Sequence, residues 1–376
     1  MFHMGRRSFA QAAAVAAAAL PGRVARAQDA DWGRDADRLI ADQFRREQLW
    51  AFARSFYGTK DLCDSAAFNA HFAQSGAALY QDATLNINFS GYTQIAADFT
   101  SFLATALARL GPGRFSKLFH VTGDLRFGAI AEYVDLQNTF YSTNGITIQT
   151  VLDFDNGQVA RDTDYWDTRE LGASDIIGPA VTAGVALPLG TIHAGGVPLA
   201  SSTPAPPGPV SLATGVTGRP SASSDMVYFA QTLHQALTLG SARDVLEFFT
   251  EDAAYVNPLI HQGPVLYGNF DQTIQIKGRE LIGRLFQAGL QLLPDCRGST
   301  LVHVVGGPSG GGFEWKAGGP FIHTGINRDG LVGCTALDLT NGKISRMSVK
   351  FDTFQLAPQD YEYIRSAIRR AGVRDA

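Results

Sequence analysis

The chain has 376 residues, a length expected for two domains with additional segments rather than for one domain. Its formal net charge of −4, from 31 basic and 35 acidic side chains, argues against nucleic acid and anionic lipid as partners. Its three cysteines make no disulfide framework and no metal-binding spacing. We expect Cys63, Cys296 and Cys334 to be free buried thiols, with a Cys296–Cys334 bond as the alternative.

Residues 1–27 have the layout of a twin-arginine export signal. Arg6-Arg7 precede a mildly apolar run that ends at Leu20, and Ala25-Arg26-Ala27 supplies small residues for cleavage. The run is too short and too rich in alanine to anchor the chain in a membrane, and no later stretch is apolar enough to span one. Cleavage would remove four arginines and no acidic residue, so the net charge would become −8. We expect a periplasmic protein; an alanine-rich disordered start is the alternative.

Residues 28–171 are predicted to form a first domain in which helices precede strands. Apolar spacing predicts helices over 35–56 and 95–110, the second one ending at Gly111-Pro112-Gly113. A short strand is expected over 84–89. Alternating residues over 116–166 predict long antiparallel strands, with turns at Gly123-Asp124, Asn144-Gly145 and Asn156-Gly157.

Residues 172–225 are rich in Gly, Pro, Ser and Ala, which predicts a linker that is partly docked on the surface. Residues 226–376 then repeat the order of the first domain. A helix over 226–237, a short helix capped by Ser241 and reaching Phe249, a strand near Tyr255 and a helix over 281–293 precede strands over 301–354. The glycine-rich stretch 306–312 lacks the Lys-Ser/Thr of a phosphate loop, so we interpret it as a hairpin turn.

The two domains are copies of each other. Residues 142–168 align without a gap to residues 327–353, with nine of 27 positions identical. Upstream, Leu-Phe-His-Val-Thr-Gly at 118–123 matches Leu-Val-His-Val-Val-Gly at 301–306. A period of this length marks a duplicated domain and not a solenoid repeat. Each copy is predicted to have an α+β fold.

The strand endings resemble those of a known superfamily. Glu132-Tyr133-Val134-Asp135 and Asp164-Tyr165-Trp166-Asp167, placed after helices, are similar to the closing strands of the nuclear transport factor 2-like superfamily. That superfamily includes ketosteroid isomerase, scytalone dehydratase, SnoaL-like polyketide cyclases and limonene-1,2-epoxide hydrolase, together with binding and scaffold members. The resemblance implies two tandem cone-shaped domains, each with helices packed on a curved antiparallel sheet around a mostly apolar cavity.

The resemblance to the epoxide hydrolase implies that Asp135 and Asp164 are a catalytic carboxylate pair. Tyr133 stands where that enzyme has an arginine, which favours proton transfer, isomerisation or dehydration over epoxide opening. The resemblance to ketosteroid isomerase implies a catalytic role for Tyr133, as donor to a developing oxyanion. Strand alternation places Tyr133 with Asp135 on one face, and Asp162, Asp164 and Trp166 on one face of the last strand. Two carboxyls close together in an apolar pocket separate their pKa values, so one serves as base and the other as acid. The alternative is that Asp135 and Asp164 face water at the rim.

Other candidate residues are paired between the copies. His120 is a candidate cavity acid or base, and because His303 is its counterpart, a structural role in the sheet is the alternative. In the second copy Tyr255 and Asn257 are similar to the epoxide hydrolase residues that hold the attacking water, and Trp315 replaces Tyr133. We expect Trp166, Asp162, Tyr255, Asn257, His303 and Trp315 to contact ligand. Asp167 and Asp352 occur in both copies and are interpreted as structural.

The sequence therefore predicts an exported, cofactor-independent acid/base enzyme acting on a small hydrophobic molecule in the first domain. Isomerase, dehydratase and epoxide-hydrolase-like reactions all remain open. No His-x-His, HExxH, Cys-x-x-Cys or Gly-x-Ser-x-Gly motif points to a metal or a nucleophilic serine. A non-catalytic periplasmic binding or scaffold protein is the alternative. An intrachain pseudo-dimer or a homodimer is expected.

Overall fold

The computed structural model describes residues 32–84, 87–136, 145–167, 212–260, 275–318 and 331–372. Two compact units are distinguished, residues 1–44 and 45–376, and both sheets lie in the second. The predicted export signal, Asn144 and most of the predicted linker fall outside the described residues. No helix in the described ranges combines the length and the hydropathy that a membrane crossing requires.

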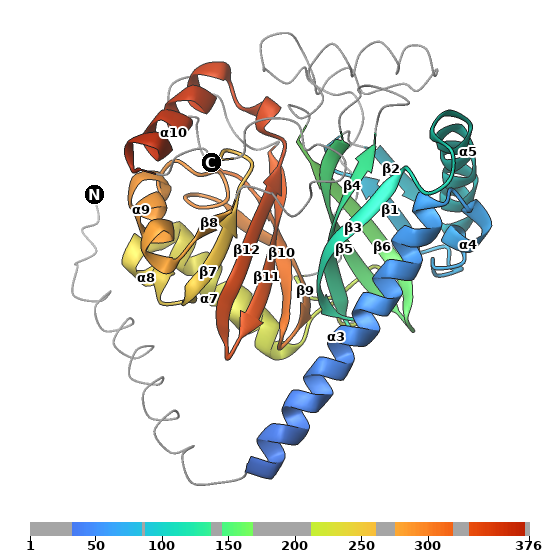
Figure 1. The fold of residues 1–376 in the computed structure, drawn as a ribbon, viewed down its shortest axis with the longest axis horizontal. Helices are drawn as coiled ribbons and strands as arrows, with labels where there is room; N and C mark the ends of the chain where they lie inside the picture. Colours follow the sequence, from blue (N-terminus) through green and yellow to red (C-terminus); the bar gives the residue numbers. More distant parts are fainter. Residues whose placement is uncertain are drawn as a thin grey trace, which may run out of the picture. The chain divides into compact units, whose positions relative to one another are not determined.

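In the first repeat, helices are followed by long strands, as predicted (Figure 1). Its helices are α3 (Trp32–Asp61), α4 (Ser65–Asn69) and α5 (Tyr92–Leu110). Its strands are β1 (Leu79–Asp82), β2 (Ile87–Ser90), β3 (Ser116–Asp124), β4 (Gly128–Leu136), β5 (Gly145–Asp155) and β6 (Gln158–Trp166). Helix α5 ends where the Gly-Pro-Gly stretch begins, because Gly111 takes a φ of 78° that other residues rarely adopt.

The Asn-Gly turn between β5 and β6 is confirmed. Asn156 and Gly157 have φ values of 53° and 78°, and their counterparts Asn341 and Gly342 have 52° and 72°. Positive φ at both central residues is what a two-residue hairpin turn requires. The turn expected at Gly123-Asp124 lies further along instead, because β3 continues through Asp124.

The strand predicted over 84–89 corresponds to β2, which begins later, at Ile87, and the strand β1 that precedes it was not predicted. β1 and β2 make an antiparallel hairpin, and β1 also pairs with β6 in parallel. The β1–β6 pairing joins segments about 80 residues apart in the chain, such as Tyr80 and Asp162. A local hydrophobic pattern carries no information about such a partner.

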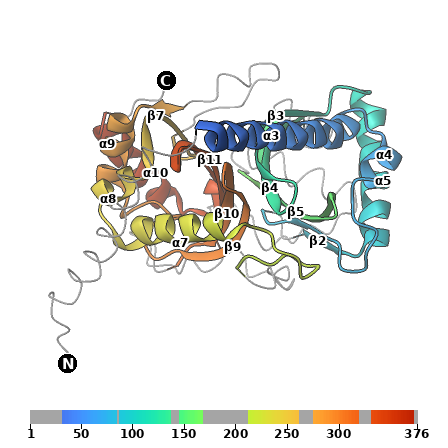
Figure 2. The ribbon, with the colours of Figure 1, turned by 90° about the horizontal axis from the view of Figure 1, so that it is seen from below.

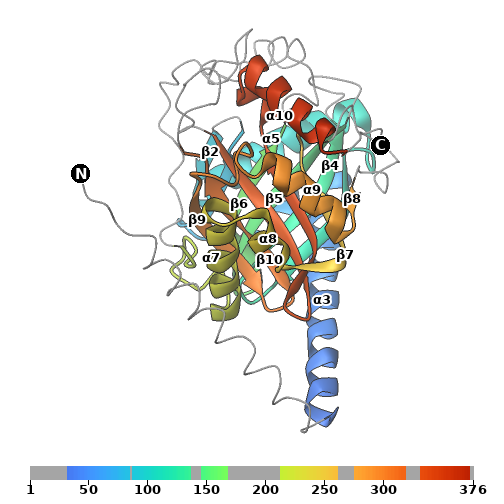
Figure 3. The same cartoon turned by 90° about the vertical axis from the view of Figure 1, so that its left-hand side faces the viewer.

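The second repeat has the same order of elements. Its helices are α7 (Ser224–Leu239), α8 (Ala242–Leu246), α9 (Arg279–Gly289) and α10 (Pro358–Arg370), and a 3-10 turn, η5, covers Thr353–Gln355. Its strands are β7 (Phe249–Val256), β8 (Ile276–Lys277), β9 (Thr300–Gly307), β10 (Gly310–Lys316), β11 (Val332–Thr340) and β12 (Lys343–Phe351). Helix α7 runs beside β9 (Figure 2), and α9 and α10 lie side by side (Figure 3). The short helix ends at Leu246 and Phe249 opens a strand, so the prediction of helix up to Phe249 is wrong.

The two sheets have identical topology, which confirms the duplication. The strand orders are β2-β1-β6-β5-β4-β3 and β8-β7-β12-β11-β10-β9. Neighbouring strands are antiparallel except for one parallel pair in each sheet, β1–β6 and β7–β12. Each sheet is thus mixed, and the expectation of a purely antiparallel sheet is wrong for the one parallel pair in each. The expected α+β fold in two tandem copies is confirmed.

Each sheet has an inner face covered by its own helices and an outer face that packs against the other repeat. The inner faces contribute to two separate hydrophobic cores, one for each repeat. A third, smaller core joins the outer faces and consists of Ile130, Val151, Tyr165, Val305, Cys334 and Ala336. The two repeats of the chain therefore bury their sheets against each other. This is the intrachain pseudo-dimer, one of the two arrangements that were expected.

Buried ion pairs cross this interface in reciprocal fashion. Arg161 of β6 pairs with Glu314 of β10, and the equivalent Arg346 of β12 pairs with Glu132 of β4 at 2.5 Å. His303 contacts Asp153 at 2.9 Å, and the equivalent His120 contacts Asp338 at 3.0 Å. Several positions that the two copies share are thus used to join the copies, which is the geometry of an isologous dimer interface.

Candidate active site

Carboxyl groups gather on the inner face of the first sheet. They belong to Asp82 of β1, Asp135 of β4, and Asp162 and Asp164 of β6. Strand pairing sets Asp82 beside Asp164, and Thr150 of β5 lies on the other side of Asp164. Asp135 and Asp164 are only 1% and 5% exposed, so the alternative that they face water at the rim is wrong.

Asp164 accepts hydrogen bonds from three hydroxyl groups. Tyr133 donates to its Oδ1 at 3.1 Å, and Tyr80 donates to its Oδ2 at 3.0 Å. The Thr150 hydroxyl also donates to Oδ1. Charge-assisted hydrogen bonds of this kind are among the stronger ones in proteins, so they fix this carboxylate in one orientation.

Lys60 of α3 supplies a cation that the sequence analysis missed. Its Nζ lies 2.8 Å from Asp135 Oδ2 and donates to the Tyr133 hydroxyl at 3.1 Å. The Nζ also lies 4.3 Å from the centroid of the Tyr133 ring. Lys60 is 5% exposed. Tyr133 stands where the epoxide hydrolase has an arginine. The positive charge next to Tyr133 and Asp135 is therefore supplied by a helix and not by that strand.

One signal in the sequence could have revealed Lys60. The buried stripe of α3 contains Leu49, Ala53, Phe56 and Tyr57, and Lys60 continues it at helical spacing. A lysine on the apolar side of a helix is seldom fully buried unless it is paired. Its partner could not be read from the sequence, because Asp135 lies 75 positions further along.

The acidic groups of this cluster have unequal proton affinities. Burial raises the pKa of Asp162 well above its usual value, and the neighbouring Asp164 charge raises it further. Burial also raises the pKa of Asp135, but the Lys60 ammonium opposes that shift. The Oδ1 atoms of Asp135 and Asp162 are both buried and make no hydrogen bond. The Ser116 hydroxyl also lies beside the Asp135 carboxyl, so Oδ1 of Asp162 is the oxygen with no neighbouring donor.

Aromatic side chains complete the cluster. The Trp166 indole donates to Asp82 Oδ2 at 3.0 Å, so Trp166 lies on the predicted face but its polar atom is engaged by the protein. Tyr57 of α3 packs on Tyr133 with ring centroids 4.4 Å apart. Burial raises the pKa of both phenols, and the carboxylates around them raise it further. Both tyrosines thus stay protonated near neutral pH and can act as hydrogen-bond donors.

His120 and His303 do not belong to either inner face. His120 Nε2 contacts Asp338 of the second repeat, and His303 contacts Asp153 of the first. The prediction that these histidines serve a cavity as acid, base or ligand contact is wrong, and the alternative of a structural role in the sheets holds. A β-bulge between Leu118 and His120 changes the face to which the histidine points, which strand alternation alone cannot reveal.

Asp167 also joins the repeats, as expected of a structural residue. Its carboxylate accepts hydrogen bonds from the backbone N–H of Thr353 at 3.2 Å and from the Thr353 hydroxyl at 2.7 Å. Thr353 is the position that matches Thr168 in the first repeat. Asp167 and Thr353, two residues of this shared motif, therefore belong to the interface and not to the carboxyl cluster.

The predicted ligand residues of the second repeat are buried in its own core. Tyr255 and Trp315 are fully buried, and the Trp315 indole donates to Thr335 Oγ1 at 3.2 Å. Asn257 donates to the Tyr255 hydroxyl at 2.9 Å. Ala317 and Val349 occupy the positions that match Asp135 and Asp164, so the sheet of this repeat lacks that acidic pair.

The described residues contain no group of three or more His, Cys, Asp or Glu side chains that could hold a metal ion. Cys63, Cys296 and Cys334 are free and buried, as expected. Cys334 donates to Gln149 Oε1 at 3.0 Å, across the interface between the repeats. The alternative of a Cys296–Cys334 disulfide is therefore wrong.

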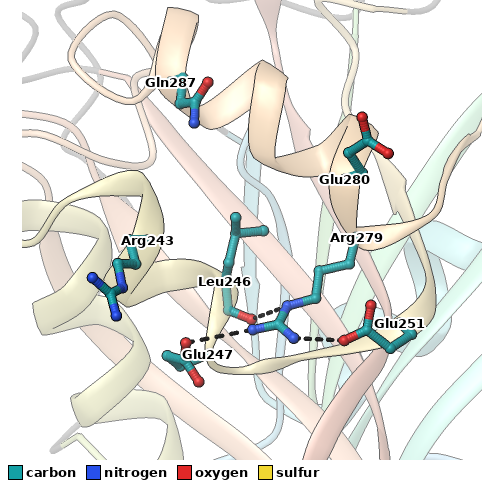
Figure 4. A pocket seen from close by; sticks show the side chains of 7 residues that line it. All are labelled: Arg243, Leu246, Glu247, Glu251, Arg279, Glu280 and Gln287. Carbon is teal, nitrogen blue, oxygen red and sulfur yellow. Dashed lines mark hydrogen bonds and ion pairs between the residues drawn. The ribbon is translucent and has the colours of Figure 1, made fainter.

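A surface pocket of about 430 Å³ lies apart from these residues (Figure 4). It is lined by Arg243, Leu246, Glu247, Glu251, Arg279, Glu280 and Gln287. Arg279 donates to the Leu246 carbonyl at 3.0 Å and pairs with Glu251 at 2.7 Å, so its guanidinium is satisfied by the protein. This pocket contains none of the predicted site residues.

No protein-family model matches the chain, and neither does any curated protein sequence. Similar solved structures include an NTF-2 like protein of unknown function from Burkholderia xenovorans LB400, at 16% identity over 32% of this chain and 84% of that chain (TM-score 0.26). A putative ketosteroid isomerase from Kribbella flavida DSM 17836 is 17% identical over 32% and 78% of the respective chains (TM-score 0.25). A SnoaL-like protein of unknown function from Burkholderia thailandensis E264 is 10% identical over 34% and 96% (TM-score 0.26). Each covers about a third of the chain.

Proposed function

We propose that the first repeat is a cofactor-independent acid/base enzyme acting on a small, largely apolar carbonyl compound, in keeping with the resemblance of its strand endings to the nuclear transport factor 2-like superfamily. The observation that carries the proposal is the buried Oδ1 of Asp162, which makes no hydrogen bond and has no neighbouring donor. Buried polar atoms are normally satisfied, and exceptions often mark sites of function. Export to the periplasm remains part of the proposal on the strength of residues 1–27 alone.

Asp135 serves as the base in this proposal. Burial raises its pKa above the usual value, and the Lys60 ammonium opposes that rise and favours the charged form that a base needs. Its Oδ1 takes a proton from the carbon next to the substrate carbonyl. The electron pair of that C–H bond moves towards the carbonyl oxygen and gives an enolate. The protonated Asp135 carboxyl exchanges this proton with solvent and delivers a proton to another carbon of the conjugated system, so the net reaction is an isomerisation that introduces deuterium in D2O.

Asp162 serves as the hydrogen-bond donor to the enolate oxygen. Burial and the Asp164 charge keep its carboxyl protonated at a pH where an ordinary aspartate is ionised. A neutral carboxyl in an apolar site can stabilise developing negative charge without adding a charge of its own. Tyr133 was expected to have this role, but its proton is donated to Asp164. In the present proposal Tyr133 and Asp164 position the cluster, and Asp162 contacts substrate.

Deuterium exchange tests the proposal without knowledge of the natural substrate. We expect the protein to catalyse uptake of deuterium from D2O into β,γ-unsaturated cyclic ketones, together with formation of the conjugated isomer, measured by NMR and ultraviolet absorbance. Asp135→Asn and Asp162→Asn should each lower the rate by a factor on the order of 10² to 10⁴, the usual contribution of general acid–base catalysis. Asp252→Asn, at an exposed position of the second repeat, is the matched control and should leave the rate unchanged.

Exchange no faster than in buffer with the whole panel of ketones would contradict the proposal, as would equal rates for Asp135→Asn and the unaltered protein. A binding protein is the second candidate, because Lys60 and the three hydroxyl donors to Asp164 already satisfy most of the cluster. Mass spectrometry of small molecules that copurify with the protein separates the two. A bound molecule recovered unaltered after long incubation would favour binding.

A further inference from the structure

Strand β6 of the first repeat separates two sets of side chains. Asp162 and Asp164 lie on its inner face, within the carboxyl cluster. The residues that alternate with them lie on the outer face, which packs against the second repeat: Arg161, Thr163 and Tyr165. A group that binds this outer set therefore also fixes the backbone that carries the two acids.

One carboxylate of the second repeat, that of Glu314 in β10, binds both ends of this outer set. Arg161 Nη1 donates to its Oε1 at 3.1 Å, and Arg161 Nη2 donates to its Oε2, so both oxygens hold the guanidinium. The Tyr165 hydroxyl also donates to Oε1, at 2.7 Å. Burial raises the pKa of this phenol and the Glu314 charge raises it further, so the phenol stays a donor near neutral pH. Bidentate pairing with arginine is geometrically specific, so these contacts restrict the position of β6.

Hydrogen bonds continue from Arg161 into the neighbouring strand β1. Arg161 Nη1 also donates to Thr163 Oγ1 at 2.9 Å, and the Thr163 hydroxyl donates to Gln81 Oε1 at 3.1 Å. Gln81 directly follows Tyr80, whose hydroxyl donates to Asp164. The interface between the repeats is thereby connected to two of the strands that hold the cluster, β6 and β1.

The Arg161 guanidinium acts on Asp162 as well, because the two residues are neighbours in β6. Burial is the main cause of the raised pKa of Asp162, and the positive charge of Arg161 opposes it. The other charged groups that act most on this carboxyl belong to the cluster: Asp164, Lys60 and Asp82. The negative charges of Glu314 and Asp153 neutralise the guanidinium and so favour the protonated form of Asp162.

We infer, building on the proposed function, that Glu314 of the second repeat is a positioning residue for the acids of the first. It fixes the strand that carries Asp162 and Asp164. It also neutralises the guanidinium beside Asp162, which keeps that carboxyl able to donate a hydrogen bond. The second repeat thereby contributes to the site of the first, although its own sheet lacks the acidic pair.

The reciprocal ion pair of the interface has no such acids to position. Glu132 pairs with Arg346 of β12 at 2.5 Å. In β12, however, Met347 and Val349 stand where the first repeat has its two acids. Equivalent contacts thus hold a strand with acids in one repeat and a strand without them in the other.

NMR titration of the aspartate carboxyl groups tests this inference. The protein is isotope-labelled at these carbons, and the Asp162 signal is assigned as the one that Asp162→Asn removes. Glu314→Gln takes away a negative charge beside Arg161, so the ionised form of Asp162 is favoured. The titration midpoint of Asp162 should then fall by about half a pH unit or more. Glu314→Asp keeps the charge but withdraws it from Arg161 by one methylene, so its midpoint should lie between the two.

Asp338→Asn is the matched control, because it also removes a carboxylate from the interface. Asp338 pairs with His120 of β3, a strand that contributes no carboxyl group to the cluster. This variant should lower stability, measured by urea unfolding, and leave the midpoint of Asp162 unchanged. An unchanged midpoint in the Glu314 variants would overturn the inference, as would an equal fall in Asp338→Asn. If Glu314→Gln does not fold, the midpoint of Glu314→Asp decides in the same way.

The titration requires no turnover, so this inference and the proposed activity can fail separately. A lowered midpoint in a protein that catalyses no exchange would contradict the enzyme and support the role of Glu314. Where exchange is catalysed, Glu314→Gln should lower kcat by up to about threefold at a pH above the midpoint and leave KM unchanged. The reason is that an ionised Asp162 donates no hydrogen bond to the enolate oxygen.

Discussion

Lys60 illustrates how one buried cation organises a site made of acids. Its ammonium contacts Asp135 and the Tyr133 hydroxyl, and Tyr133 in turn donates to Asp164. A single side chain from α3 thereby connects groups on β4 and β6 of the sheet. Without that cation, Asp135 would carry an uncompensated charge in a region that is almost closed to water.

Replacing Lys60 by methionine should therefore destabilise the protein strongly at neutral pH. Breaking a buried ion pair by removing one partner costs about 3–5 kcal/mol, because the other charge remains buried. The Lys60→Met, Asp135→Asn double variant should recover part of that loss, and urea unfolding of all four proteins gives the coupling energy. Lys277→Met, at an exposed position, should change stability by less than about 0.5 kcal/mol. A single variant as stable as the unaltered protein would show that the pair contributes nothing.

The face of the sheet on which a residue lies was predicted correctly where the alternation along its strand is regular. Tyr133, Asp135, Asp162 and Asp164 lie on the inner face because alternation along β4 and β6 is regular there. His120 was misplaced because a bulge interrupts the alternation of β3. Lys60 and Tyr80 join the carboxyl cluster from other elements, α3 and β1. Their place in the cluster depends on tertiary packing, and no local pattern in the sequence predicts it.

At the scale of elements, turns and helix ends were predicted correctly where they depend on the backbone preferences of neighbouring residues. The Asn-Gly turn and the Gly-Pro-Gly helix stop depend on backbone preferences of a few residues, and both lie where the sequence places them. The strand β1 was missed because its stability comes from parallel pairing with β6. Helix α10, which covers Pro358–Arg370, was not predicted, because it lies beyond the last strand of the repeat and has no counterpart in the sequence of the first copy.

The short helix α8 provides a test of such local encoding. The Ser241 hydroxyl accepts a hydrogen bond from the Asp244 backbone N–H, and the Asp244 carboxylate accepts one from the Ser241 N–H at 2.8 Å. Ser241→Ala should lower the free energy of unfolding by about 1 kcal/mol, because a backbone donor at the helix start loses its acceptor. Ser101→Ala, within the exposed side of α5, is the control and should have little effect. Equal stability of the two variants, measured by urea unfolding, would mean that the cap is not needed.

At the scale of the whole molecule, the interface between the two sheets contains buried ion pairs that neither sheet could form alone. Arg161 is buried at the interface, where it contacts Glu314 of the other repeat and Asp153 of its own. Asp153 also contacts His303 of the other repeat. Burial alone would raise the pKa of Asp153, but the charges of Arg161 and His303 lower it to about 2. The interface is therefore a source of stability that depends on pH.

The sign of that dependence follows from the lowered pKa. An acid with a depressed folded-state pKa contributes stability above its unfolded value and loses it as the pH falls through the folded value. Asp153→Asn should thus cost at least about 2 kcal/mol at neutral pH, and the difference from the unaltered protein should shrink between about pH 4 and pH 2. Urea unfolding across that range measures it. A difference that is constant with pH would exclude the ionised Asp153 as its cause.

The reciprocal ion pairs have a consequence for how the two repeats can diverge in evolution. Each repeat presents a surface that a copy of itself could occupy, as in a dimer of two separate single-repeat chains. Covalent fusion makes that association independent of concentration and leaves the two halves free to differ. In a homodimer a mutation is present in both subunits, whereas in the fused chain it is present in one repeat only. One repeat can therefore keep its buried carboxyl groups while different side chains fill the interior of the other.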